Sequence, residues 1–208
     1  MINNTELSKA INIVKQTGPT KPLWFDVKAR QLRVETVNFN EKCLDITLNH
    51  PIYVDTPTPV LFKAGEDEAL LLSLKEGGRR LIFQGGAPHW LVRPGESLHI
   101  RHPSLKIGKP LFTNKELAKI EQVKTAGFSK YFLSYVGSQW EVDQFQELVG
   151  KDAELYLKIE DLKGLQFVAR DFKPQENIHL VAACGDMYVE VDRPHDILPA
   201  LQLIIEKD

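Results

Sequence analysis

The sequence predicts a mixed α/β fold in which a small all-β domain is inserted into a domain with a parallel sheet. From Thr113 onward, strand-like segments alternate with helical segments, which is typical of parallel βαβ units. Between residues 32 and 102, short strand-like segments follow one another, separated by glycine-containing turn signals and without a helical period. We therefore expect residues 1–31 and 103–208 to form the α/β domain and residues 32–102 to form the inserted β-rich domain.

Residues 5–16 place Leu7, Ile11 and Val14 on one helical stripe, which predicts an amphipathic helix. A short apolar run, residues 22–26, follows and turns polar at Asp26, as expected of a buried strand that ends in a loop. The inserted domain is expected to contain five short strands, at residues 32–37, 44–48, 69–74, 80–83 and 97–100.

The segment Thr113-Asn-Lys-Glu116 has the pattern of a capping box and predicts the start of a helix. A helix at 139–148, closed by Gly150, is expected between two strands. The remaining predicted elements are strands at 130–136, 154–159 and 178–184, a short irregular helix at 162–172 and a final helix at 195–206. Together with the strand at 22–26, this gives about four parallel strands.

Composition and charge narrow the class of protein. The 208 residues are 43% hydrophobic and 26% charged, as in ordinary globular proteins, and no apolar run approaches the roughly 20 residues that span a bilayer. The 26 Lys and Arg residues against 28 Asp and Glu residues give a formal charge of -2, which disfavours nucleic acid and anionic membranes as partners. Cys43 and Cys184 are too few for a disulfide framework or a thiolate zinc site. We expect a reduced, cytoplasmic protein, with Cys184 as an inert core thiol.

Two charged segments at predicted strand ends are candidates for chemistry. Strand alternation places Lys158 and Glu160 on the same side of one strand, and Gly185-Asp186 follows the next strand. Because the carboxyl ends of parallel strands meet at one edge, Glu160 and Asp186 could share a Mg²⁺ ion, which takes one or two protein carboxylates. Each segment taken alone also fits a structural role, the first as a salt bridge at a strand end and the second as a turn.

Four sequence blocks, in order and spread over about residues 17–206, resemble pyruvate kinases. LKIEDLKGL followed by HLVAACGDMYVEV is similar to that family's A-K-I-E-N-x-x-G-[VL] and M-V-A-R-G-D-L-G-V-E. The segment from Ala126 to Val136, with Glu141 and Asp143 after it, resembles G-x-D-F-I-A-x-S-F-V and the start of the next helix. Leu23 to Arg33 resembles A-L-D-T-K-G-P-E-I-R, and the β-rich insert follows where that family carries its lid domain.

The resemblance implies a partial TIM-type (pyruvate kinase-like) barrel and gives each matching residue a role. Lys158 would be the catalytic residue beside the transferred phosphoryl group, and Glu160 and Asp186 would hold Mg²⁺. Ser134 and Gly185 would line the substrate pocket. By the same resemblance Lys28 and Arg33 would bind substrate, with Arg33 near the nucleotide phosphates, and Asp26 would match a ligand of the family's K⁺ ion.

The chain also departs from the family pattern. The N-x-R-x-N-F-S-H-G and A-T-Q-M-L segments have no counterpart, and Val27, Ala29 and Cys184 replace the family's Thr, Gly and Arg. About four of eight barrel strands are present, which would leave two strand edges open. We therefore expect a homo-oligomer or a partner chain to cover these edges.

Three functions remain open from the sequence. The first is Mg²⁺-dependent phosphoryl transfer between phosphoenolpyruvate and ADP, or a related reaction of an enolpyruvate or small carboxylate. The second is a catalytically degenerate binding or regulatory subunit, which the missing segments favour. The third is a metal-dependent aldolase or lyase of the enolpyruvate barrel group, against which the inserted domain and Lys158 argue.

Overall fold

A computed structural model describes residues 4–18, 22–40, 43–84, 91–191 and 193–208. The chain divides into two compact units, which we call unit 1 (Met1–Ala29 and Phe112–Asp208) and unit 2 (Arg30–Leu111). Unit 2 extends nine residues further than the insert expected from the sequence, to residue 111 instead of 102. The physical reason is that Ile107 belongs to a strand of unit 2 and accepts a hydrogen bond from Arg30 Nη1 (2.6 Å).

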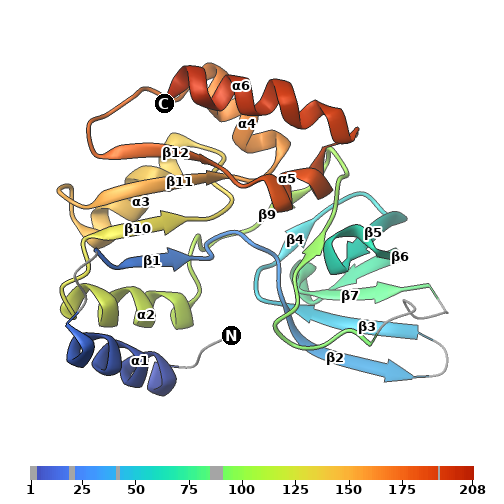
Figure 1. Ribbon diagram of the computed structural model, residues 1–208. Coiled ribbons are helices and arrows are strands. Elements are labelled where there is room, and N and C mark those ends of the chain that lie inside the picture. Colours follow the sequence, from blue (N-terminus) through green and yellow to red (C-terminus); the bar gives the residue numbers. More distant parts are fainter. Residues whose placement is uncertain (1–3, 19–21, 41–42, 85–90, 192) are drawn as a thin grey trace. The chain divides into compact units, whose positions relative to one another are not determined.

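Unit 1 is built on a four-stranded sheet in the order β1-β10-β11-β12, in which every neighbouring pair is parallel. The predicted parallel sheet within a mixed α/β fold is therefore confirmed. Its strands are β1 (Trp24–Val27), β10 (Lys130–Leu133), β11 (Glu154–Ile159) and β12 (Ile178–Ala182) (Figure 1). Its helices are α1 (Asn4–Thr17), α2 (Asn114–Thr125), α3 (Gln139–Val149), α4 (Leu162–Arg170), α5 (Cys184–Glu190) and α6 (Ile197–Lys207), with a short 3₁₀ helix at Pro194–Asp196.

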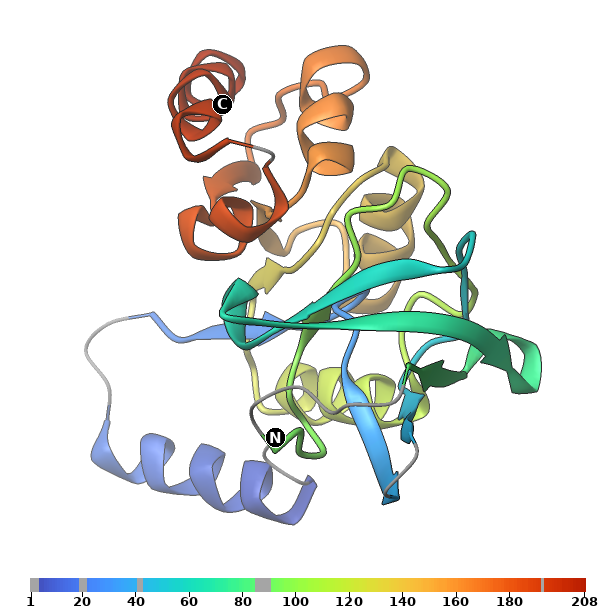
Figure 2. The same ribbon diagram turned by 90° about the vertical axis from the view of Figure 1, so that its right-hand side faces the viewer.

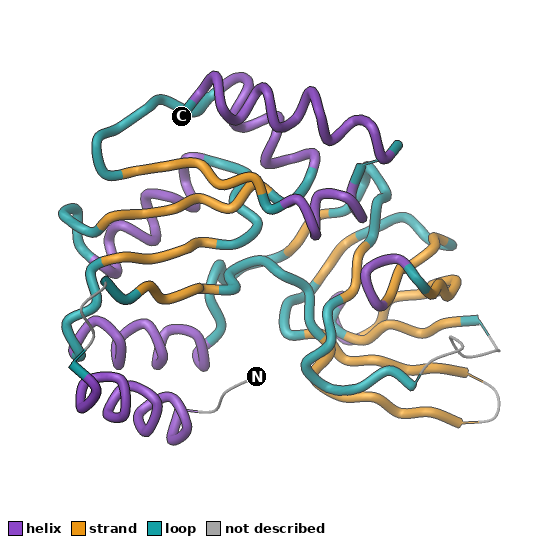
Figure 3. The backbone as a smooth tube through the Cα atoms, viewed as in Figure 1, coloured by secondary structure: helices purple, strands orange, loops and turns teal. Residues whose placement is uncertain are grey.

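The two faces of this sheet have different surroundings. Leu155, Leu157 and Ile159 of β11 are fully buried on the face that the helices cover. On the same face, the Tyr131 ring of β10 packs edge-to-face against Phe145 of α3, with centroids 5.6 Å apart. Figures 1 and 3 show α3 behind the sheet and none of the described helices of unit 1 in front of it. Side chains of the alternate strand positions therefore lie on a face without a helical layer in unit 1.

Local sequence signals set several element boundaries. The capping box before α2 is confirmed, since Thr113 Oγ1 accepts the Glu116 N–H (3.3 Å) and Glu116 Oε2 accepts the Thr113 N–H (2.7 Å). The helix predicted to close at Gly150 does so, with the Gly150 N–H donating to the Gln146 carbonyl.

The sequence missed α5. The strand predicted for 178–184 ends at Ala182, and the chain turns into α5 once the Ala183 N–H has made its bond to the Ile159 carbonyl (3.2 Å). Burial of Met187 and Val189 stabilises this short helix. Cys184 lies exposed in its first turn, so the expectation of a core thiol was wrong.

Unit 2 contains a six-stranded antiparallel sheet in the order β2-β3-β7-β6-β5-β8 and a separate two-stranded pair, β4 with β9. Hydrogen bonds join Leu32 and Val34 to the segment Gly95–Leu98, so the two ends of the six-stranded sheet meet and the sheet curls. The strands are β2 (Val34–Asn40), β3 (Cys43–Leu48), β4 (Ile52–Tyr53), β5 (Thr58–Phe62), β6 (Asp67–Lys75), β7 (Arg80–Phe83), β8 (Leu98–His99) and β9 (Lys106–Ile107), with 3₁₀ helices at Lys63–Gly65 and Glu76–Gly78.

Three strands of unit 2 were not predicted. β4 and β9 are two residues long and are too short to display alternation, while Pro59 in β5 disfavours a strand prediction.

Among the described residues of both units, no helix combines the length and apolar content that a membrane crossing requires.

The outer edge of β12 carries a side-chain cap. In the parallel ladder the Leu155 N–H donates to the Asn177 carbonyl and the Ala183 N–H donates to the Ile159 carbonyl, so the Leu180 N–H points away from β11. This N–H donates instead to Oδ1 of Asp208 (2.5 Å), which directly follows α6. Figure 2 shows α6 beside α4, against which it packs. The cap satisfies a donor on a strand edge that could otherwise pair with another chain.

We predict that Asp208→Ala lowers the free energy of unfolding by about 1 kcal/mol, because it leaves the Leu180 N–H without its acceptor. Asp208→Asn is the matched control, since an amide oxygen can still accept this bond. Urea unfolding measures the stability, and analytical ultracentrifugation at rising concentration should show more self-association of the Ala variant. Equal stability of the Ala variant and the wild type would contradict a stabilising role.

Candidate functional site

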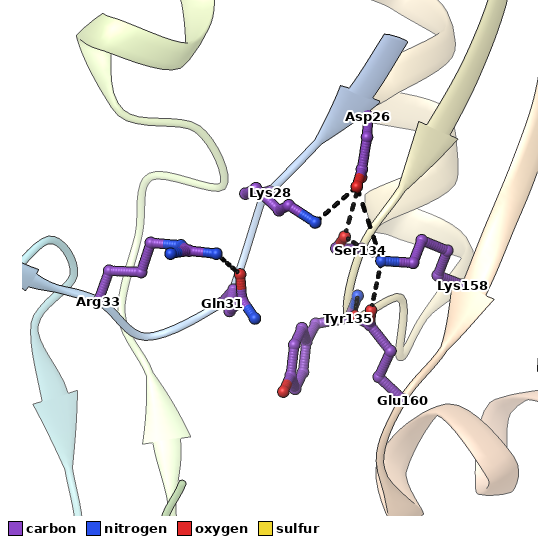
Figure 4. Close-up of polar contacts among 8 residues, drawn as sticks. All are labelled: Asp26, Lys28, Gln31, Arg33, Ser134, Tyr135, Lys158 and Glu160. Carbon is purple, nitrogen blue, oxygen red and sulfur yellow. Dashed lines mark hydrogen bonds and ion pairs between the residues drawn. The ribbon is translucent and has the colours of Figure 1, made fainter. Parts of the chain in front are cut away.

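The candidate site lies where the parallel strands end. Lys158 is at its centre (Figure 4). Lys158 Nζ lies 2.7 Å from Glu160 Oε1, donates to Ser134 Oγ at 3.2 Å and lies 3.8 Å from Asp26 Oδ2. Because β1, β10 and β11 are parallel neighbours, the residues near their carboxyl ends come together, although Asp26 is more than 100 positions away from Ser134 and Lys158 in the sequence.

Asp26 connects β1 to this centre. Its Oδ1 accepts a hydrogen bond from Ser134 Oγ (3.2 Å), and its Oδ2 accepts one from Lys28 Nζ (2.5 Å). The structure thus brings together five of the residues that the sequence singled out, which are Asp26, Lys28, Ser134, Lys158 and Glu160.

Glu160 is the most buried charged group of the site, with 1% of the residue exposed. Its Oε2 accepts the Tyr135 N–H (2.7 Å), and its Oε1 lies 2.7 Å from the Lys158 ammonium and has no further hydrogen-bond partner among the described residues. Burial, assisted by the charge of Asp186, raises the pKa of Glu160 to about 7 against the lowering effect of Lys158. Glu160 therefore offers a buried carboxylate oxygen with unused acceptor capacity.

The Lys158 ammonium is held charged by its neighbours. Burial alone would lower its pKa, but the carboxylates of Glu160, Asp26 and Asp186 outweigh burial and the pKa of Lys158 is raised. At neutral pH this side chain is a fixed cation at the carboxyl edge of the sheet, able to neutralise an anionic group.

Asp186 lies in the first turn of α5, next to Gly185. Its charge raises the pKa values of Glu160 and Lys158, which places it within electrostatic reach of both. A Cβ added to Gly185 would meet no atom within 4 Å, so its backbone is open to close approach.

The described residues contain no cluster of three or more His, Cys, Asp or Glu side chains arranged to hold a metal. Two carboxylates, such as those of Glu160 and Asp186, are a sufficient protein contribution for a Mg²⁺ ion, which completes its octahedron with water and substrate oxygens. Such an ion would compete with the Lys158 ammonium for Glu160 Oε1.

Tyr135 is a site residue that the sequence did not indicate. Its backbone has φ 54°, a left-handed conformation that is unfavourable for a bulky side chain, and this turn directs its N–H to Glu160 Oε2. Burial, followed by the charges of Asp186 and Glu160, raises the pKa of the Tyr135 phenol. Only the backbone conformation reveals its role, and no sequence pattern specifies that conformation for tyrosine.

Asp161 was also missed and fixes the helix beside the site. It N-caps α4 by accepting the Gly164 N–H (2.7 Å), and burial raises its pKa to about 6. A Cβ at Gly164 would lie 2.8 Å from the Val136 carbonyl oxygen, so only glycine permits this close approach of α4 to the end of β10.

Arg33 lies in unit 2, outside the group of side chains that unit 1 brings together. Its Nη1 donates to the Gly95 carbonyl (2.6 Å), and its Nη2 donates to the Gln31 side chain, as Figure 4 also shows. The guanidinium is thus hydrogen-bonded within its own unit.

The raised pKa of Glu160 predicts a pH-dependent stability. The folded state holds this proton more tightly than the unfolded state, whose pKa is near 4.5, so the contribution of Glu160 to stability is greatest below pH 4.5 and is lost as the pH rises through 7. Glu160→Gln removes the titration. We expect the wild type to lose roughly 1 to 3 kcal/mol relative to this variant between pH 4.5 and 7.5, measured by urea unfolding. A difference that does not change with pH would contradict the assignment.

A scan against protein-family models and a search of curated proteins found no match to this chain.

Proposed function

We propose that the carboxyl edge of the unit 1 sheet binds Mg²⁺ together with an enolpyruvate-type substrate, and that the protein catalyses Mg²⁺-dependent phosphoryl transfer between phosphoenolpyruvate and ADP or a related reaction of a small carboxylate. One observation carries this proposal. The buried Glu160 carboxylate holds its Oε1 2.7 Å from the Lys158 ammonium, and that oxygen has no further hydrogen-bond partner among the described residues. A metal and a phosphate require these two groups side by side.

The charge balance of the site supports a cation. When Glu160 is ionised, the three carboxylates of Asp26, Glu160 and Asp186 lie within electrostatic reach of two ammonium groups, of Lys28 and Lys158, which leaves an excess of one negative charge. A Mg²⁺ ion held by Glu160 and Asp186 would reverse this sign and attract an anionic substrate. Lys158 would then compensate the charge on the transferred group, which is the main requirement of phosphoryl transfer.

We also infer that the unit 1 sheet is part of a TIM-type barrel. Its strand order follows the chain order without the reversal that marks doubly wound sheets. Right-handed crossovers then put all connecting helices on one face, as in a barrel. A second copy or a partner chain would cover the remaining edges, and on the β12 side it would displace the Asp208 cap.

A second candidate is a binding or regulatory protein that keeps the ligand site without turnover. It is favoured by the Arg33 guanidinium, whose Nη1 and Nη2 each donate to a group of unit 2 and whose Nε is buried, because a phosphate-binding arginine has to present its N–H groups to the ligand.

We predict that Mg²⁺ with oxalate, a mimic of enolpyruvate, raises the melting temperature of the wild type, because a ligand that binds only the folded state stabilises it. Glu160→Gln should weaken oxalate binding at least tenfold by calorimetry. Glu141→Gln is a matched control, since Glu141 is also buried, accepts a backbone N–H at 2.7 Å and pairs with a lysine, but lies at the start of α3. Unchanged binding in the Glu160 variant would contradict the metal assignment.

A coupled assay with phosphoenolpyruvate, ADP and Mg²⁺ separates the two candidate functions. We expect turnover that falls at least a hundredfold in Lys158→Met, because the side chain loses its charge and keeps its length. Wild-type protein that binds Mg²⁺ and oxalate without turnover, with or without K⁺, would support the binding protein instead.

A further inference from the structure

Four aromatic side chains form a continuous row on the face of the unit 1 sheet that none of the described helices of unit 1 covers. We call Trp24, Phe132, Tyr156 and His179 the aromatic band. Phe132, Tyr156 and His179 occupy the same register level on β10, β11 and β12. The Trp24 ring extends past Phe132 (5.1 Å between centroids) to meet Tyr156 edge-on (4.2 Å), and Tyr156 contacts His179 (4.7 Å). The band therefore crosses the entire sheet.

The aromatic band adjoins the candidate site. Phe132 and Tyr156 precede Ser134 and Lys158 by two residues on the same strands, so their side chains point to the same side. Two residues of a parallel strand span about 6.6 Å. Asp26 occupies the same register level as Phe132, and it is also bonded to Ser134. A ligand bound at Lys158 would thus have the rings of Phe132 and Tyr156 about two strand residues away.

The band is half-buried, in contrast to the opposite face of the sheet, where Tyr131 and Leu155 are fully buried. The charged side chains of Lys130 and Glu154, next to the Trp24 end of the band, neutralise each other. Lys130 forms an ion pair with Glu154 and also lies 5.1 Å from the centroid of the Trp24 ring. Parallel sheets are normally covered on both faces, so partly exposed rings here provide an apolar surface that a flat ligand group can cover.

We propose that the site takes a ring-bearing 2-oxo acid, or its enol form, with the acid group at Lys158, Glu160 and Asp186 and the ring against the aromatic band. This inference rests on the proposed function, because it uses the same anion and metal site. Pyruvate itself would leave the band uncovered. A nucleotide fits less well, because a ribose separates its ring from its phosphates and exceeds the two-residue step between Tyr156 and Lys158.

Calorimetry with Mg²⁺ and either pyruvate or phenylpyruvate tests the inference on the whole chain. We expect phenylpyruvate to bind at least tenfold more tightly than pyruvate. Fluorescence of the Trp90→Phe, Trp140→Phe double variant, which retains Trp24 alone among the three tryptophans, should change on addition of phenylpyruvate and stay unchanged with oxalate.

In Trp24→Leu, phenylpyruvate should bind less than threefold more tightly than pyruvate, while the Kd of oxalate stays within twofold of the wild-type value. Trp140→Leu is the matched control, because Trp140 lies on α3 and is 40% exposed, and it should keep the full preference. Phe132→Leu provides a second variant of the band should Trp24→Leu fail to fold, as judged by circular dichroism.

The outcomes separate this inference from the proposed function. Equal affinities for the two acids, or a preference that persists in both band variants, would overturn the ring site and leave the metal site intact. A fluorescence change of Trp24 with ADP but not with phenylpyruvate would assign the band to a nucleobase and overturn the acid. Absence of Mg²⁺-dependent binding of oxalate and of both acids would overturn the inference and the proposed function together.

Discussion

The parallel register of β1, β10, β11 and β12 is the constraint on which the candidate site depends. It sets Asp26 level with Phe132 and Tyr156, and it puts Lys158 one step further along the strands. A shift of one residue in β11 would turn Lys158 into the helix-covered face and bring Ile159 out. Burial of Leu155, Leu157 and Ile159 against the helices therefore fixes the position of the charged residues on the opposite face.

Burial and charge pairing act against each other at this edge. Burial disfavours the charged forms of both Lys158 and Glu160, yet each charge offsets the penalty on the other. The balance differs between the two groups. Lys158 has three carboxylates nearby and stays charged, whereas Glu160 has one lysine and a neighbouring Asp186 that opposes its ionisation. A proton, the lysine and a metal would consequently compete for the same carboxylate, which links metal binding to pH.

The sequence was sufficient for features that depend on periodicity and failed for those that depend on tertiary contacts. Alternation predicted the strand at 154–159 with its final bounds, and with it the shared side of Lys158 and Glu160. The start of α5 could not be predicted, because the apolar run through Ala182 gives no sign of where the β12 pairing ends. The left-handed Tyr135 was equally hidden, since its conformation is held by the bond of its N–H to Glu160.

The aromatic band bears directly on how the sheet could be completed. In a closed TIM-type barrel, interior side chains from alternate strands fill the centre in layers. Here the Trp24 ring lies along the sheet, crossing Phe132 to reach Tyr156, and so occupies space above its neighbours that opposing strands would need. Interior side chains of a second half and a flat ligand would both lie against this ring. A completed barrel and a ligand on the band can therefore coexist only if the closing strands leave the space above Phe132 open.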